Sequence, residues 1–235
     1  MTTRKSGGLR TIEVARRAGY SVQQVRNLER DGVLPPAART GSGYRSYDER
    51  HVWSALAYRA LATATGPVEA KTIMRAAQAY PGSDLFALLD AAHARLDAER
   101  RELALAKQAA EAIAAEPIAD VRPSDSLSIS ELAEAIGVRP STLRHWDAEG
   151  LVVPSRASAR EPRRYSPAEV RTARIVHQLR LAGYGITALR ALVPRLGRGE
   201  EVGAALVVRS AVIERRARAL FDAAGALGRL LSGEG

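Results

Sequence analysis

Cysteine is absent from the 235-residue sequence. Its absence excludes disulfides, thiolate metal sites, iron–sulfur clusters and cysteine nucleophiles. No apolar run approaches the ~18 residues of a transmembrane helix, and the basic start lacks the apolar core of a signal peptide. The sequence therefore predicts a cytoplasmic, nucleoid-associated protein with no membrane segment.

Catalytic motifs are also missing. The four histidines, His51, His93, His145 and His177, fall in different predicted elements without the spacing of metal ligands. There is no phosphate-binding loop, nucleophile elbow or dinucleotide fingerprint. We therefore expect no enzyme activity, no cofactor and no metal site.

Positive charge is present but unevenly distributed. Residues 1–79 carry a net charge of +7 and residues 127–199 carry +6, whereas residues 80–126 carry −4 and residues 200–235 are balanced. Concentrated positive charge is typical of proteins that bind nucleic acid, because neutralised phosphates release their counterions. A solvated basic surface is the alternative interpretation.

The two basic blocks are copies of each other. A shift of 118 residues brings them into register without a gap, which indicates a duplication. The aligned positions include Ala15 with Ala133, Gly19 with Gly137, Arg26 with Arg144, Glu29 with Asp147, Gly32 with Gly150, Arg45 with Arg163 and Tyr47 with Tyr165.

Each copy predicts a short helix, a tight turn, a second helix and a wing. Ser21 with Gln24 in the first copy and Ser128 with Glu131 in the second fit capping boxes. Arg139, which aligns with Ser21, is a poor cap. The Pro-, Arg- and Gly-rich segments that follow favour a two-stranded wing over a helix.

Both copies resemble the winged helix-turn-helix of the MerR family of bacterial transcription regulators. The resemblance rests on GYSVQQVRNLERDGVLPP…GSGYRSY in the first copy and GVRPSTLRHWDAEGLVVP…RRYSPAEV in the second, and spans roughly residues 9–75 and 127–193. The first copy keeps the better wing and the second the better recognition helix. The implied fold is mainly α, with two winged helix-turn-helix domains, each followed by a long coiled-coil helix, in a pseudo-two-fold arrangement.

The resemblance also implies which side chains contact DNA. Recognition helices read base edges and wings hold phosphate or the minor groove. The implied base-reading residues are Gln23, Gln24, Arg26, Asn27, Ser141, Thr142, Arg144 and His145. The implied wing residues are Arg39, Tyr44, Arg45, Tyr47, Arg156, Arg163, Arg164 and Tyr165. For Tyr47 and Tyr165 a core position is the alternative, and Trp146 is expected in the core.

Two segments carry apolar residues at alternating spacings of four and three, which is typical of a coiled-coil seam. The first seam is Leu85, Leu89, Ala92, Leu96, Glu99, Leu103, Ala106, Ala110 and Ile113. The second is Val202, Leu206, Arg209, Ile213, Arg216, Leu220, Ala223, Leu227 and Leu230. An ordinary amphipathic helix is the alternative. We hypothesise that Glu99 and Arg216, which interrupt the seams, attract each other and set the register.

These patterns predict five segments. They are domain 1 at 1–79, coiled-coil helix 1 at 84–115, a linker at 116–126, domain 2 at 127–199 and coiled-coil helix 2 at 200–231. The first helix is about 48 Å long at ~1.5 Å per residue, whereas the linker reaches about 36 Å. Antiparallel pairing of the two helices would let one chain form a pseudodimer. A homodimer with four DNA-binding units is the alternative.

The predicted function is sequence-specific transcription regulation on double-stranded promoter DNA. The resemblance implies DNA distortion and RNA polymerase as a partner, while repression is equally open. The alternatives are an architectural or recombination DNA-binding factor and a small-molecule-binding or sequestering protein on a MerR-like scaffold. Only four residues follow Leu231, so we expect no separate sensor domain. An effector would then bind near Trp53, Tyr58, Tyr80 or Phe86, unless these aromatics belong to the core.

Overall fold

The computed structural model of the protein describes residues 8–118, 120–154, 162–196 and 202–232. Its described part is mainly helical with short strands, as the sequence predicts. The chain consists of two compact units. Unit 1 comprises residues 1–97 and 212–235, and unit 2 comprises residues 98–211.

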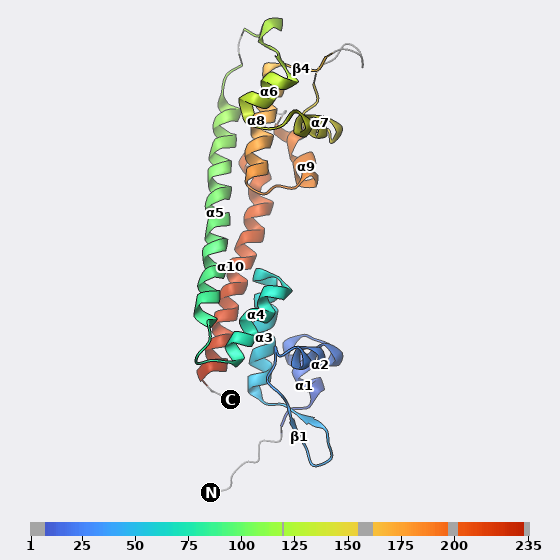
Figure 1. Ribbon diagram of the computed structural model, residues 1–235, viewed down its shortest axis with the longest axis vertical. Coiled ribbons are helices and arrows are strands. Elements are labelled where there is room, and N and C mark those ends of the chain that lie inside the picture. The colour runs from blue at the N-terminus through green and yellow to red at the C-terminus, as the bar shows by residue number, and fades with distance from the viewer. Residues whose placement is uncertain (1–7, 119, 155–161, 197–201, 233–235) are drawn as a thin grey trace. The chain divides into compact units, whose positions relative to one another are not determined.

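Unit 1 contains the first copy of the repeat (Figure 1). Its elements are α1 (Thr11–Ala18), α2 (Val22–Arg30), β1 (Ala38–Arg39), β2 (Arg45–Ser46), α3 (Glu49–Thr65) and α4 (Pro67–Gln78), with the beginning of α5 (Leu85–Ala115) and the end of α10 (Val202–Ser232). Gly19 ends α1 in the left-handed region at φ 72°, a conformation that favours glycine. The backbone nitrogen of Gln24 then donates to Ser21 Oγ at 3.1 Å, and Ser21 N donates to Gln24 Oε1 at 2.7 Å. The predicted capping box of the recognition helix is confirmed.

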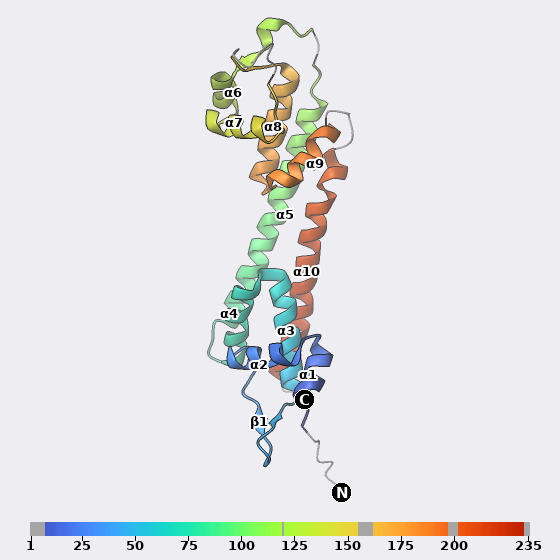
Figure 2. The same ribbon diagram turned by 90° about the vertical axis from the view of Figure 1, so that its right-hand side faces the viewer.

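The first wing is an antiparallel hairpin in which Arg39 lies opposite Arg45. Its turn is closed by a hydrogen bond from Thr40 N to Tyr44 O at 2.8 Å. Figure 2 shows the hairpin projecting from unit 1 beyond α1 and α2. The predicted two-stranded wing is therefore confirmed in the first copy.

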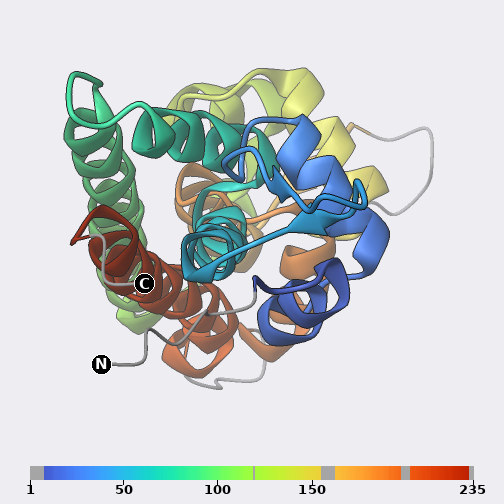
Figure 3. The same ribbon diagram turned by 90° about the horizontal axis from the view of Figure 1, so that it is seen from below.

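The last turns of α10 pack on α3 within unit 1, as Figure 3 shows from the wing side. Arg216 Nε donates to the carbonyl oxygen of Ala64 at 2.7 Å. The guanidinium carbon of Arg229 lies 4.8 Å from the centre of the Trp53 ring, a cation–π contact. Helix α3 therefore packs against α1 and α4 of its own copy as well as against α10.

Unit 2 contains the second copy. Its elements are the 3-10 turn η1 (Pro123–Asp125), β3 (Leu127–Ser128), α6 (Ile129–Ile136), α7 (Pro140–Ala148), β4 (Arg164–Tyr165), α8 (Pro167–Leu181) and α9 (Ile186–Leu196), with the rest of α5 and the beginning of α10. Ser128 Oγ accepts from Glu131 N at 3.3 Å and Ser128 N donates to Glu131 Oε2 at 2.7 Å, which confirms this capping box. Arg139 makes no side-chain cap, as expected, and Pro140 begins α7 instead.

The duplication is visible in the backbone as well as in the sequence. Gly137 repeats the left-handed φ of Gly19, at 71° against 72°, and Gly150 repeats that of Gly32 with the same two values. The pairing of Leu127 with Tyr165 also repeats the bridge between Leu9 and Tyr47. Both copies therefore fold along the same path over the positions that align.

The predicted seams supply the buried side of both long helices. In α5 the buried seam residues are Leu85, Ala92, Leu96, Leu103, Ala106, Ala110 and Ile113. In α10 they are Ile213, Leu220, Ala223, Leu227 and Leu230. Leu89, Glu99, Arg209 and Arg216 are half-buried, and the side chains of Val202 and Leu206 lie outside the described part. The alternating spacing of four and three thus predicts most of the buried positions of both helices, while Ala219 and Ala226 of α10 are also buried outside the predicted seam.

Candidate nucleic-acid interface

Recognition helix α2 presents the polar face that the sequence predicts. Gln23, Gln24 and Arg26 are exposed and Asn27 is half-buried. Gln23 Nε2 donates to Asn27 Oδ1 at 3.1 Å, while the Gln24 carbonyl oxygen is already used in the capping box. Arg26 has no hydrogen-bond or ion-pair partner among the described residues. Its guanidinium is thus available to a base edge or a phosphate.

The first wing divides into residues that point to solvent and residues that hold it in place. Tyr44 is 74% exposed, and Arg39 is also exposed while donating from Nη1 to Gly43 O at 3.1 Å. Arg45 instead donates from Nε to Glu29 Oε2 at 2.8 Å. Since Glu29 lies on α2, this ion pair ties the wing to the recognition helix.

Tyr47 lies in the core of the first copy, with 1% of its surface exposed. Its hydroxyl donates to Glu29 Oε2 at 3.1 Å and its ring meets His51 edge-on at 5.0 Å. Burial raises the pKa of the Tyr47 phenol, so the phenol keeps the proton that it donates. The core alternative therefore holds, and we withdraw the assignment of Tyr47 to DNA contact.

Recognition helix α7 presents the matching face in the second copy. Ser141, Arg144 and His145 are exposed and Thr142 is half-buried. Arg144, the counterpart of Arg26, also has no partner among the described residues. Trp146 is 3% exposed and belongs to the core, as expected.

The second wing is held to its recognition helix by the same kind of ion pair. Arg163 Nε donates to Asp147 Oδ2 at 3.0 Å, as Arg45 does to Glu29. Arg164 is exposed and donates from Nη2 to Ser126 O at 2.7 Å. Tyr165 is fully buried, so it too is a core residue and not a DNA contact. Arg156 lies outside the described residues.

A second set of basic residues supports the carboxyl ends of the recognition helices. Asp31 follows α2 and accepts from Lys71 Nζ at 2.6 Å, and its carbonyl oxygen accepts from Arg75 Nε at 3.0 Å. Lys71 holds the pKa of the Asp31 carboxyl below its usual value. In unit 2 the Glu149 carbonyl accepts from Arg190 Nε at 3.1 Å. Cations suit helix carboxyl ends because of the helix dipole.

Sequence reasoning missed both kinds of support. It assigned Arg45 and Arg163 to phosphate or the minor groove, although the repeat aligned Glu29 with Asp147 at the end of each recognition helix. That recurring acidic position was the available signal. For Lys71, Arg75 and Arg190 the sequence offered none, because their contacts depend on how α4 and α9 pack.

Comparison with protein families matches both copies. Residues 10–47 match the family model described as MerR family regulatory protein, and residues 127–196 match that described as MerR HTH family regulatory protein. The chain carries two tandem MerR-type units. The matches support a role as a DNA-binding transcription regulator. Searches of curated proteins and of solved structures gave no match.

The MerR-type units hold no group of three or more His, Asp or Glu residues that could bind a metal, as far as their residues are described. Over the same residues, no helix has the length and apolar character needed to cross a membrane. Of the aromatics considered for an effector, Tyr58 is buried, whereas Tyr80 and Phe86 are exposed and in edge contact at 5.7 Å. Trp53 is half-buried and lines a cavity.

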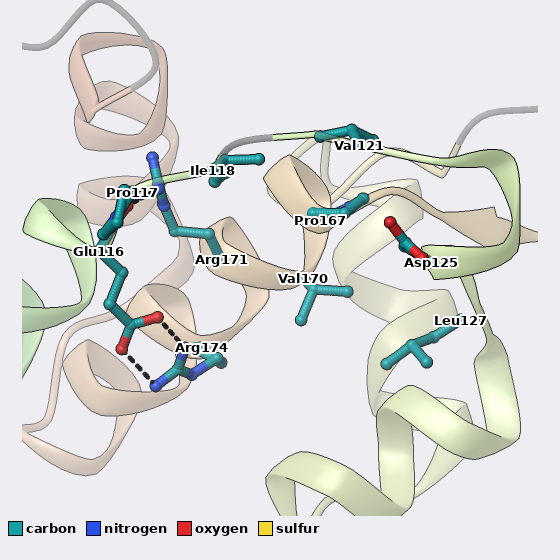
Figure 4. Close-up of a pocket in the computed structure, with 10 residues that line it drawn as sticks. All are labelled: Glu116, Pro117, Ile118, Val121, Asp125, Leu127, Pro167, Val170, Arg171 and Arg174. Atoms are coloured by element: carbon teal, nitrogen blue, oxygen red, sulfur yellow. Dashed lines mark hydrogen bonds and ion pairs between the residues drawn. The ribbon is translucent and has the colours of Figure 1, made fainter.

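The second MerR-type unit has a cavity of about 340 Å³ beside α8 (Figure 4). Glu116 at the end of α5 pairs with Arg174, with one Nη2–Oε1 distance of 2.9 Å. Arg171 donates to the carbonyl oxygen of Glu116. Arg174 holds the pKa of the Glu116 carboxyl below its usual value. The two cations of this cavity are therefore already satisfied by the protein itself.

Proposed function

We propose that this regulator binds double-stranded promoter DNA in a sequence-specific manner through α2 and α7. The observation that carries the proposal is the pair Arg26 and Arg144, which occupy aligned positions, are exposed and lack partners among the described residues. Arginine pairs with guanine in the major groove through two hydrogen bonds. Exposed Tyr44, Arg39 and Arg164 would hold the neighbouring backbone.

One chain is proposed to supply both halves of the dimer that MerR-type regulators form. Each unit contains part of α5 and part of α10. The buried seam residues are therefore covered by other residues of the same chain. This pseudodimer needs no second copy. The five segment boundaries predicted from the sequence, DNA distortion, RNA polymerase as a partner and a cytoplasmic, nucleoid-associated location are parts of the same proposal.

The two recognition helices are proposed to read different half-sites. Gln23, Gln24 and Asn27 in α2 are replaced by Ser141, Thr142 and His145 in α7. Glutamine and asparagine can form two hydrogen bonds with adenine, whereas serine, threonine and histidine make other contacts with the bases. An asymmetric operator is therefore expected, in contrast to the palindromes bound by symmetric dimers.

Light scattering of the free chain and of its complex with duplex DNA tests the proposal. The duplex is taken from the region upstream of its own gene or, if that does not bind, selected from a random library. A mass near 25.2 kDa, with one chain per duplex, supports the pseudodimer. Twice that mass would favour a homodimer with four DNA-binding units. No enrichment of any sequence would overturn sequence-specific binding.

A further inference from the structure

A cavity of about 520 Å³ lies between α3 and the end of α10 within unit 1. Its apolar wall is formed by Trp53 and Leu56 of α3 with Ala219 and Ala226 of α10. Sites for small organic ligands usually have volumes of about 300–1,000 Å³ and mostly apolar walls with a few polar groups. The size and the lining therefore suit a small organic molecule better than a bare ion.

Three arginines give this cavity a positive charge. Arg215 and Arg218 of α10 line it and have no hydrogen-bond or ion-pair partner among the described residues. Arg59 also lines it and makes one contact, from Nη1 to Ala18 O at 3.2 Å. Asp222 is the one carboxylate in the lining, so the cations outnumber the anions. The guanidinium groups of Arg215 and Arg218, which lack such partners, favour a carboxylate, because they can bind it through strong charge-assisted hydrogen bonds.

Trp53 gives the cavity an aromatic wall. The Arg229 guanidinium lies over its ring at 4.8 Å and helps to fix its orientation. A flat ring fixed in this way stacks well on another aromatic ring. An aromatic body carrying a carboxylate would therefore satisfy both the Trp53 ring and the arginines.

In the corresponding region of the second copy, the arginines are already bound by another group of the protein. Arg171 and Arg174 stand at the positions aligned with Trp53 and Leu56, and both contact Glu116 (Figure 4). The second unit therefore lacks the aromatic wall at this place and pairs its own cations. The duplication has thus left one open cationic cavity and one that is internally neutralised.

We propose that the unit 1 cavity binds a small aromatic carboxylate, with the acid group on Arg215 and Arg218 and the ring on Trp53. Helix α3 begins directly after the first wing, with Asp48 as its N-cap. An occupant between α3 and α10 therefore contacts the helix that carries the wing. Its effect on DNA affinity rests on the proposed function, whereas binding itself does not.

Calorimetric titration with 1-naphthoate, and with 1-naphthalenemethanol as a neutral analogue, tests the proposal. We expect one naphthoate per chain and affinity for the alcohol lower by about tenfold or more, because a hydrogen bond to a charged group contributes about 1.5–3 kcal/mol. The double variant Arg215→Gln, Arg218→Gln should lower naphthoate affinity by a similar factor and leave the alcohol unchanged. Arg16→Gln, an exposed position on α1, controls for the loss of positive charge.

The indole N–H signals in a ¹H–¹⁵N spectrum locate the ligand, because the chain has two tryptophans. Naphthoate should shift the Trp53 signal, identified with Trp53→Phe, and not that of Trp146. Equal affinity for naphthoate and alcohol, an equal loss in Arg16→Gln, or an unmoved Trp53 signal would each overturn the proposal. Since neither readout contains DNA, failure of DNA binding leaves this result intact. A mobility shift with and without naphthoate then measures the coupling.

Discussion

Arg45 of the first wing donates to Glu29 of the recognition helix at 2.8 Å. The duplication preserved this relationship, since Arg163 donates to Asp147 at 3.0 Å in the second copy. The acidic residue changed from Glu to Asp and the ion pair remained. A wing fixed to its recognition helix would present both proposed contact surfaces to DNA in one orientation, and this would lower the entropy lost on binding.

Removing the charge of Glu29 should loosen the first wing. We expect Glu29→Gln to lower the free energy of unfolding by about 1 kcal/mol, because the pair is partly exposed and screened by solvent. DNA affinity should fall at the half-site read by α2. Denaturant unfolding and mobility shifts measure the two effects, with exposed Glu134→Gln as the control. An unchanged DNA affinity would mean that Arg45 does not need Glu29 for its orientation.

Arg26 and Arg144 should act at different half-sites. Arg26→Ala and Arg144→Ala are each expected to weaken DNA binding by about 1–3 kcal/mol, the value of a bidentate arginine–guanine contact. Both side chains are exposed, so stability should stay within about 0.5 kcal/mol. Footprinting of each variant on the same operator shows which half is lost. Lys107→Ala on α5 serves as the control, and a symmetric footprint affected equally by both variants would refute the assignment.

The difference in capping between the recognition helices should be measurable. Arg139→Ser would let a serine oxygen accept from the Thr142 backbone nitrogen, as Ser21 does from Gln24. We expect a gain of about 1 kcal/mol in stability, and a similar loss for Ser21→Ala. Thermal unfolding reports both, with Ser130→Ala inside α6 as a reference. The capping interpretation fails if Arg139→Ser is no more stable than the parent protein.

Alkaline pH should destabilise unit 1 through Tyr20. Burial raises the pKa of this phenol from 10.0 to about 12. Between these values the unfolded chain has lost the proton and the folded protein keeps it, so the free energy of unfolding falls as pH rises. Below about pH 10 the contribution is constant. Unfolding measured at pH 9–12 should show a shallower decline in Tyr20→Phe, and identical slopes would rule this source out.

Charge reversal on the long helices should reveal which arginine sets the register. Glu99 accepts from Arg209 Nη2 at 3.3 Å within unit 2, and we still propose attraction between Glu99 and Arg216. Glu99→Arg should cost about 1 kcal/mol. If the proposed register holds, Glu99→Arg with Arg216→Glu should be more stable than Arg216→Glu alone, because both variants lose the hydrogen bond from Arg216 to Ala64. Rescue of Glu99→Arg by Arg209→Glu instead would assign that role to Arg209. If every variant unfolds like the parent, neither pair sets the register.

Features set by neighbouring residues could be predicted from the sequence. The capping boxes of Ser21 and Ser128 and the spacing of Leu96 and Leu103 depend on a few positions along one helix. Such patterns determine hydrogen bonds and buried faces locally. Because the sequence is duplicated, the same pattern could be recognised in both copies.

Features that depend on packing between distant segments could not be predicted. Whether Arg45 meets a phosphate or a carboxylate depends on the position of Glu29 in space, and propensity alone does not distinguish them. The unit 1 cavity could not be predicted from the sequence either, because Trp53 and Arg215 are far apart along the chain. Both are ordinary residues of amphipathic helices until α3 and α10 are brought together.

The membership of residues 212–232 in unit 1 affects how the protein folds on the ribosome. Domains usually fold in the order in which they are synthesised. Here residues 98–211 have all emerged before α10 can cover the Trp53 side of α3. Unit 2 can therefore fold first, whereas the fold of unit 1 is completed only when the end of α10 has emerged. A nascent chain that stops before Arg216 would lack a support of its first unit and keep every residue of its second.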